Sequence, residues 1–135
     1  MLVQHPESVA IIPVDGDEVV LVRQTRPGAP EETLELPSGK LEPGETPEQA
    51  VTRELAEECG LAARSIRELA AFWAVPAYST EYVHVFLATG LVRADAAALD
   101  DDEDVEVERL PVASALAELS DAVSVAAFAI WQLER

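Results

Sequence analysis

The chain has 135 residues, 49% of them apolar, and carries nine Lys and Arg against 26 Asp and Glu for a formal net charge of −17. The length suits one domain over residues 1–135, while the acidity would repel nucleic-acid backbones and anionic membrane surfaces. The single cysteine, Cys59, excludes an internal disulfide framework, and nowhere do eighteen apolar residues run together. We therefore expect a cytoplasmic protein that binds neither nucleic acid nor membrane.

Short strands are predicted at the start of the chain. Two β-branched runs, 8–14 and 18–24, flank the turn-forming sequence DGD and predict a hairpin. The Pro- and Gly-rich residues 26–32 predict a loop, and the alternating residues 33–37 predict a third, short strand.

A helix with clear end signals follows. Thr46 can cap its N-terminus, with Pro47 at the first helical position and Gln49 as the capping-box partner. Gly60 supplies the stop.

The second half of the chain predicts further strands and a helical tail. The strands cover 67–76, 80–90 and 105–110, and the helical spacing covers 112–119 and 124–135, with Ser120 or Asp121 as the cap of the last helix. Strands grouped around one helix, with helix at the end, predict an α/β or α+β sandwich on a mixed sheet.

Three glutamates of the predicted helix share one side. Glu54, Glu57 and Glu58 fall at i, i+3 and i+4, where like charges repel by about 0.2–0.5 kcal/mol per pair. A solvated face is the ordinary explanation of such a pattern. A divalent cation would reverse the repulsion, because Mg²⁺ prefers oxygen ligands and commonly combines carboxylates with water and phosphate oxygens. The helix is therefore a candidate magnesium site.

The same segment carries a complete motif. Its positions are Gly39, Glu45, Arg53, Glu54, Leu55, Glu57, Glu58, Gly60 and Leu61. They match the Nudix box, G-x5-E-x7-R-E-U-x-E-E-x-G-U, with U aliphatic. The chain therefore resembles Nudix hydrolases, which implies an α/β/α sandwich with a mixed sheet and the Nudix loop-helix-loop.

Flanking segments resemble one subgroup more closely. VRQTRPG, TLELPSGKLE, Pro76 and DDDEDVEVERLP are similar to ADP-ribose pyrophosphatases and related nucleoside-diphosphate-sugar hydrolases. This resemblance implies Mg²⁺-dependent hydrolysis, with Mn²⁺ as a substitute, of ADP-ribose to AMP and ribose 5-phosphate. Two alternatives stay open: hydrolysis of dinucleoside polyphosphates or nucleoside triphosphates, and a sensor that binds nucleotides without cleaving them. Pyrophosphatases of this family are often dimeric, and we expect a homodimer.

The resemblance also implies roles for motif residues. Glu54, Glu57 and Glu58 would bind the metal, together with the backbone carbonyl of Ser38. Arg53 and Glu45 would pair to brace the loop against the helix, which their opposite charges support. Gly39 and Gly60 are read as backbone residues, for close approach and for the helix stop.

Catalytic and substrate residues follow from the subgroup. The general base is expected in the acidic loop, first at Glu103 and then at Asp101, with Glu81 or the box-helix Glu54 as the next candidates. A second set of residues is expected to contact the substrate, namely Arg26 through phosphate, Glu35 through ribose or adenine, and Tyr78, which resembles an aromatic of dinucleoside-polyphosphate hydrolases.

Overall fold

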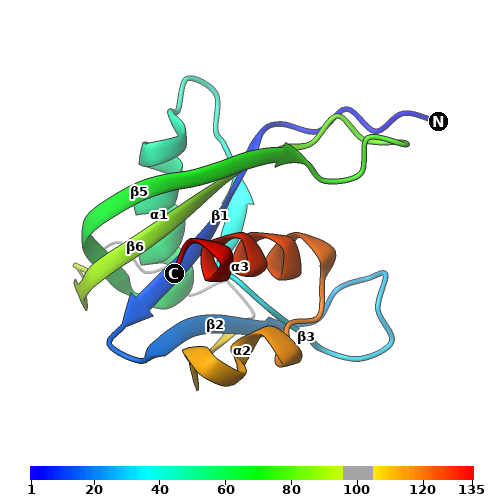
Figure 1. The fold of residues 1–135 in the computed structure, drawn as a ribbon. Coiled ribbons are helices and arrows are strands. Elements are labelled where there is room, and N and C mark those ends of the chain that lie inside the picture. The colour runs from blue at the N-terminus through cyan, green and yellow to red at the C-terminus, as the bar shows by residue number, and fades with distance from the viewer. Residues whose placement is uncertain (96–104) are drawn as a thin grey trace.

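The computed structural model describes residues 1–95 and 105–135. The elements in these ranges are β1 (Ser8–Asp15), β2 (Glu18–Gln24), β3 (Thr33–Glu35), β4 (Ser38–Lys40), α1 (Pro47–Cys59), β5 (Leu61–Trp73), β6 (Tyr82–Arg93), β7 (Val105–Pro111), α2 (Val112–Glu118) and α3 (Ala122–Glu134) (Figure 1). The predicted α+β class is confirmed. Within the described ranges, no helix combines the length and the apolar character needed to span a membrane.

The strands form one mixed sheet. Its main order is β3-β2-β1-β6-β5, with β4 also pairing with β1 and β7 with β2. The β1–β6 pair is parallel, whereas the pairs of β1 with β2 and of β5 with β6 are antiparallel. The predicted DGD hairpin is confirmed, because Asp15 lies opposite Glu18 and Gly16 takes a φ of 63° in the turn.

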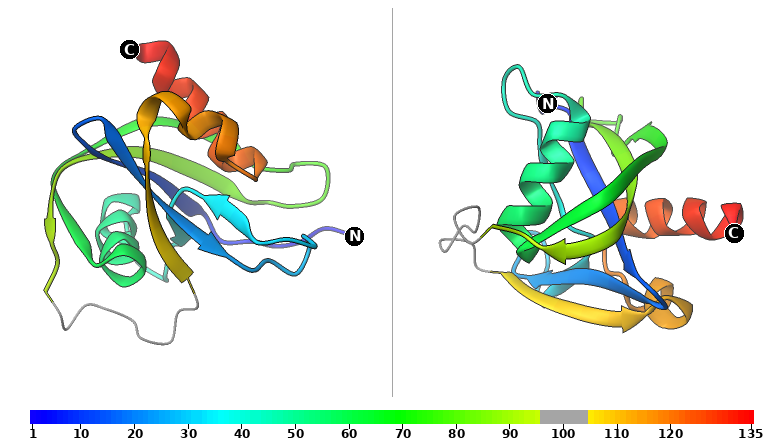
Figure 2. Two further views of the ribbon diagram at one scale, coloured as in Figure 1. Left: turned by 90° about the horizontal axis from the view of Figure 1, so that it is seen from below. Right: turned by 90° about the vertical axis from the view of Figure 1, so that its left-hand side faces the viewer.

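Side-chain alternation along β1 builds a core on each face of the sheet. Val9 and Ile11 pack with the apolar face of α1, whereas Ala10 and Ile12 pack in the cluster that contains Phe128 of α3. Neighbouring residues of a strand point to opposite faces, so one strand supplies both layers. Figure 2 shows α1 and α3 on opposite sides of the central strands.

The ends of α1 follow its sequence signals. The Thr46 side chain accepts from the Gln49 backbone, the Gln49 side chain accepts from the Thr46 backbone, and Gly60 ends the helix at φ 68°. The following strand begins earlier than predicted, at Leu61 and not at 67. Its first residues pair with the end of β6, Leu61 opposite Arg93, a long-range pairing that the weakly alternating sequence LAARS does not indicate.

Candidate metal and substrate site

The three glutamates of α1 are held in different environments. Glu54 and Glu58 are buried, each only 8% exposed, whereas Glu57 is half-buried. The Ser38 backbone N–H donates to Glu58 Oε1 at 2.9 Å, which ties the carboxylate to β4. Burying two like charges is costly unless each has compensating partners, so these positions indicate more than a solvated helix face.

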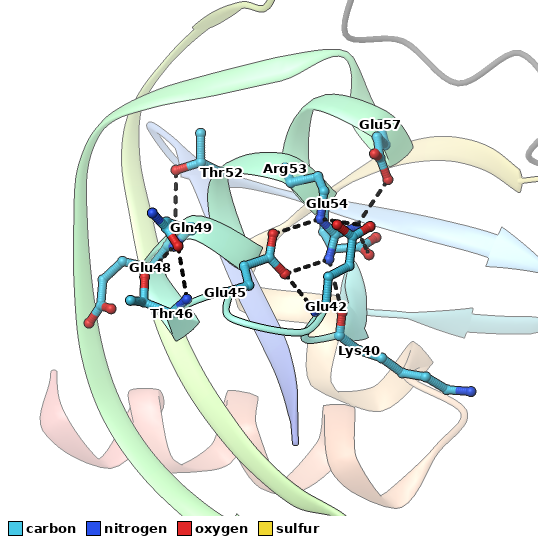
Figure 3. A network of polar contacts seen from close by, with 10 residues as sticks. All are labelled: Lys40, Glu42, Glu45, Thr46, Glu48, Gln49, Thr52, Arg53, Glu54 and Glu57. Carbon is cyan, nitrogen blue, oxygen red and sulfur yellow. Dashed lines mark hydrogen bonds and ion pairs between the residues drawn. The ribbon is translucent and has the colours of Figure 1, made fainter. Parts of the chain in front are cut away.

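Arg53 compensates part of this charge (Figure 3). Its Nε and Nη2 bind the two carboxylate oxygens of Glu45 at 2.8 and 2.9 Å, which is the pair that the sequence predicts. Its Nη1 donates to Glu54 at 2.6 Å and to Glu57 at 3.2 Å, and its Nη2 also donates to the Lys40 carbonyl. The hydrogen bond from Arg53 lowers the pKa of Glu45. One guanidinium thus links the loop before α1 to two glutamates of the helix.

Gly39 allows Glu54 to reach its position. A Cβ built on Gly39 would lie 2.1 Å from Glu54 Cδ and Oε1, closer than real Cβ atoms approach other heavy atoms. The requirement is space, since positive φ values among the described glycines occur elsewhere. Gly39 is therefore needed for close approach, as its place in the motif implies.

A cavity of about 360 Å³ opens over these groups. Its lining includes Glu54, Glu58, Ser38, Gly39 and Arg26. Over residues 1–95 and 105–135, no three acidic, His or Cys side chains converge into a ready ligand set, and Glu57 is turned to Arg53. Mg²⁺ usually takes one or two carboxylates and keeps several waters, so the donor chemistry of Glu54 and Glu58 fits this ion.

Comparison with known proteins assigns this arrangement to a family. The family model described as "NUDIX domain" matches residues 4–129. The chain belongs to the Nudix family. Its match extends well beyond the box, over both helical layers and the sheet.

Two curated relatives of this Nudix chain match most of its length. It is 41% identical over 117 residues to "ADP-ribose pyrophosphatase" of Bacillus subtilis (strain 168), covering 85% of this chain and 63% of that protein. It is 37% identical over 117 residues to "Methanol dehydrogenase activator" of Bacillus methanolicus, with the same coverage of 85% and 63%. The chain thus spans slightly less than two thirds of these curated relatives.

A solved structure shares the fold closely. The "Crystal structure of ADP compounds hydrolase" superposes with a TM-score of 0.84 at 25% sequence identity, over 95% of this chain and 71% of that one. The predicted Nudix-type sandwich is therefore confirmed.

A second cavity of about 330 Å³ adjoins the first. Both are lined by Arg26, Ser38 and Gly39, and the second also by Glu35 and Glu81. The substrate residues predicted in the Nudix chain, Arg26 and Glu35, bind each other here: Nε and Nη2 of Arg26 each donate to one Glu35 oxygen at 2.9 Å. Burial opposes ionisation of Glu35, but these hydrogen bonds outweigh it and its pKa is lowered.

The remaining predicted residues lie in different places. Glu81 lines the second cavity, where its Oε2 accepts from Ser8 Oγ at 2.7 Å. Tyr78 is 53% exposed in the turn after β5 and lines neither cavity. Asp101 and Glu103 lie outside the described residues.

The sequence interpretation did not place Asp121 in a cavity. Asp121 lines the second cavity, but its sequence context indicated only a helix cap. The place of Asp121 in the cavity wall depends on the packing of the start of α3 against β3. Ser120 and Ser124 make this contact, since their hydroxyls accept from the Leu34 and Leu36 backbone N–H groups.

Proposed function

We propose that this chain is a Mg²⁺-dependent Nudix hydrolase that cleaves the pyrophosphate bond of nucleoside diphosphates linked to another moiety. ADP-ribose is the proposed preferred substrate, with AMP and ribose 5-phosphate as products. The observation that carries the proposal is the junction of two cavities at Ser38 and Gly39. One cavity is lined by the buried carboxylates Glu54 and Glu58. The other, of about 330 Å³, is lined by Glu35 and Glu81, and Arg26 borders both. The relatives' names support the substrate class.

The roles proposed for the chain's own groups are those that the family resemblance implies, and this arrangement supports them. Glu54, Glu57, Glu58 and the Ser38 carbonyl would hold the metal, which neutralises diphosphate charge and stabilises the leaving oxygen when it is bound. Arg53 and Glu45 hold two of these glutamates in place. Since Glu35 occupies Nε and Nη2 of Arg26, phosphate would be met by Nη1 or by an exchange of partners.

A carboxylate would remove the proton from the attacking water. The water oxygen bonds to one phosphorus, the bond from that phosphorus to the bridging oxygen breaks, and the proton passes to the carboxylate. We assign this base first to Glu103 and then to Asp101, with Glu81 as the next candidate because it lines the cavity beside Gly39. Glu54 of the box helix is the fourth candidate.

The assembly and location complete the proposal. We infer that residues 1–135 form one domain, that the protein works in the cytoplasm, and that it forms a homodimer. Exposed apolar side chains at the N-terminal segment, the end of β5 and the β5–β6 connection, namely Leu2, Trp73 and Tyr78, support an interface. Light scattering at micromolar concentration tests the dimer, and a monomer would contradict it.

The decisive experiment measures AMP from ADP-ribose with Mg²⁺, Mn²⁺ or EDTA, alongside a panel containing a dinucleoside polyphosphate and ATP. We expect AMP formation with either metal and none with EDTA. Glu58→Gln should remove most activity, because an amide cannot offset cationic charge as a carboxylate does. Glu48→Gln is the matched control, since Glu48 lies on the same helix but is exposed. Binding of ADP-ribose without product in Mg²⁺ would refute catalysis and favour a sensor.

A further inference from the structure

His84 of β6 holds two carboxylates at once. Its Nε2 lies 2.7 Å from Glu7 Oε1, and its Nδ1 lies 2.9 Å from Glu68 Oε1. A carboxylate accepts hydrogen bonds and a neutral imidazole carries a single N–H, so both contacts are hydrogen bonds only when the ring carries two protons. The side chains of Glu7 and Glu68 are 56% and 40% exposed, whereas that of His84 is 15% exposed. The cluster is therefore built around the charged form of His84.

The surroundings of His84 favour this charged form. Tyr82 of the same strand meets the ring edge-on, with centroids 5.3 Å apart, and the residues opposite His84 in β1 and β5 are apolar. Within the described part of the chain, the titratable groups that face the ring are thus Glu7, Glu68 and Tyr82. Burial alone would lower the pKa of His84, but the hydrogen bonds to Glu7 and Glu68 outweigh burial and raise the pKa.

The two glutamates lie in different parts of the fold. Glu68 belongs to β5, whereas Glu7 belongs to the segment before β1, which runs beside the β5–β6 connection (Figure 1). The Glu7 carbonyl also accepts from the Leu41 backbone N–H at 2.8 Å, which ties the same residue to the loop before α1. The contact with His84 therefore helps to fix the point at which the chain enters β1.

The start of β1 forms part of the wall of the second cavity. Ser8 lines this cavity and donates from Oγ to Glu81 Oε2 at 2.7 Å, and Glu81 lines it as well. Neighbouring strand residues point to opposite faces, so His84 holds Glu7 on one face of the sheet while Ser8 holds Glu81 on the other. One planar peptide unit joins residues 7 and 8, so a displacement of Glu7 also moves Ser8.

We propose that His84 is a positioning residue of the second cavity, whose doubly protonated ring holds Glu7, and through it Ser8 and Glu81, where substrate binding needs them. This inference rests on the proposed function, since it takes the second cavity to receive part of the nucleotide. When the ring loses one proton, one of its two contacts loses its hydrogen bond and the other loses the attraction between opposite charges. The cavity wall is then held less firmly.

The test compares kcat/KM for AMP formation from ADP-ribose in the wild type, His84→Phe, Glu7→Gln and Glu68→Gln. Phenylalanine keeps a ring against Tyr82 and removes both donors, while the two carboxylates stay within reach of water. At about pH 6, His84→Phe and Glu7→Gln should each lower kcat/KM by about three- to fivefold, the size expected for a partly exposed ion pair. Glu68→Gln is the matched control, because it removes a carboxylate from the same ring but leaves Glu7 in contact, and it should stay within about 1.5-fold of the wild type.

The pH dependence separates this role from plain stabilisation. The ratio of kcat/KM in the wild type to that in His84→Phe should fall toward one as the pH rises from about 6 to about 9, because the wild-type ring loses a proton at its raised pKa. Ionisation of substrate and metal ligands cancels in this ratio. A purely structural role would lower the melting temperature of all three variants and keep the ratio at one. That result, or equal losses of kcat/KM in Glu7→Gln and Glu68→Gln, would overturn the proposal.

Hydrogen exchange tests the same link without catalysis. The Leu41 amide donates to the Glu7 carbonyl, so its protection at about pH 6 should fall in His84→Phe and Glu7→Gln but not in Glu68→Gln. If His84→Phe folds poorly, Glu7→Gln decides alone. A fall in protection without a change in kcat/KM would overturn the link to the cavity. Failure of the proposed function is separate: the wild type would form no AMP, while exchange at Leu41 would still show whether His84 holds Glu7.

Discussion

Gly39→Ala tests how closely the Glu54 carboxylate must be placed. The added Cβ would lie 2.1 Å from Glu54 Cδ and Oε1 and 2.6 Å from Cγ. Ordinary carbon contacts are about 3.5–4.0 Å, so the overlap is too large for small backbone shifts to relieve. The end of a flexible side chain can rotate away, and we expect the strand to stay while Glu54 leaves its present position.

The consequences for stability and activity differ in size. Rotation of Glu54 breaks its 2.6 Å hydrogen bond from Arg53, and both side chains are largely buried. Hydrogen bonds to charged groups contribute about 1.5–3 kcal/mol, partly offset here by about 0.4–1 kcal/mol from the stiffer unfolded chain. The net loss of about 1–2 kcal/mol leaves the protein folded. If Glu54 holds the metal as proposed, its displacement should lower kcat/KM by about 10²-fold or more, equivalent to about 2.7 kcal/mol.

The assay pairs thermal unfolding with AMP formation over a Mg²⁺ titration. Gly28→Ala is the matched control, because its Cβ would meet nothing within 4 Å and its φ is not positive. The control should retain wild-type activity, while Gly39→Ala should need more Mg²⁺ and reach a lower maximum. Wild-type kcat/KM in Gly39→Ala would refute the requirement for Glu54 at its present place.

Other predictions concern the base, the substrate pair and pH. Glu103→Gln should lower kcat by about 10²–10⁴-fold with little change in KM. If Asp101→Asn causes a loss of that size instead, Asp101 is the general base. A loss of kcat below about threefold in both variants would exclude the loop as the position of the base. Arg26→Ala should raise KM and also lower the melting temperature near neutral pH, because the buried Glu35 carboxylate loses the two hydrogen bonds from Arg26. An unchanged melting temperature would contradict the second effect. Burial disfavours the charged ring of His84, but hydrogen bonds to two flanking glutamates outweigh it and raise its pKa. Its stabilisation is complete below the unfolded pKa of about 6.5 and is lost as pH rises through the folded pKa, so the deficit of His84→Gln in melting temperature should shrink from about pH 6 to about pH 9.

Local signals made α1 and its carboxylates predictable. Thr46, Pro47 and Gly60 act within a turn of the helix ends, so their spacing alone sets the boundaries. The helical period alone likewise places Glu54 and Glu58 on one side. What the period could not give is their burial, which depends on β4 packing across the helix and donating the Ser38 N–H.

Long-range pairing accounts for the parts that the sequence did not indicate. Arg26 and Glu35 were both assigned to substrate, yet the antiparallel β2–β3 pair brings their segments together and their side chains bind each other. Asp121 reaches the cavity only because Ser120 and Ser124 dock the start of α3 on β3. Neither contact has a signature in a short window of sequence.

Glu58→Gln also makes a stability prediction that separates charge from hydrogen bonding. Arg53 contacts Glu54 and Glu57, which offsets part of the repulsion along the helix, and Glu58 accepts from Ser38. Glutamine keeps an acceptor oxygen for that bond while its neutral amide removes about 0.2–0.5 kcal/mol of repulsion per like-charged pair.

Without metal, the melting temperature of Glu58→Gln should therefore equal or slightly exceed that of the wild type. Metal binding to the folded state stabilises it by RT ln(1 + [L]/Kd). Added Mg²⁺ should therefore raise the melting temperature of the wild type above that of Glu58→Gln. A variant less stable than the wild type by more than about 1.5 kcal/mol in EDTA would show that the Glu58 charge itself supports the fold, because hydrogen bonds to charged groups contribute about 1.5–3 kcal/mol.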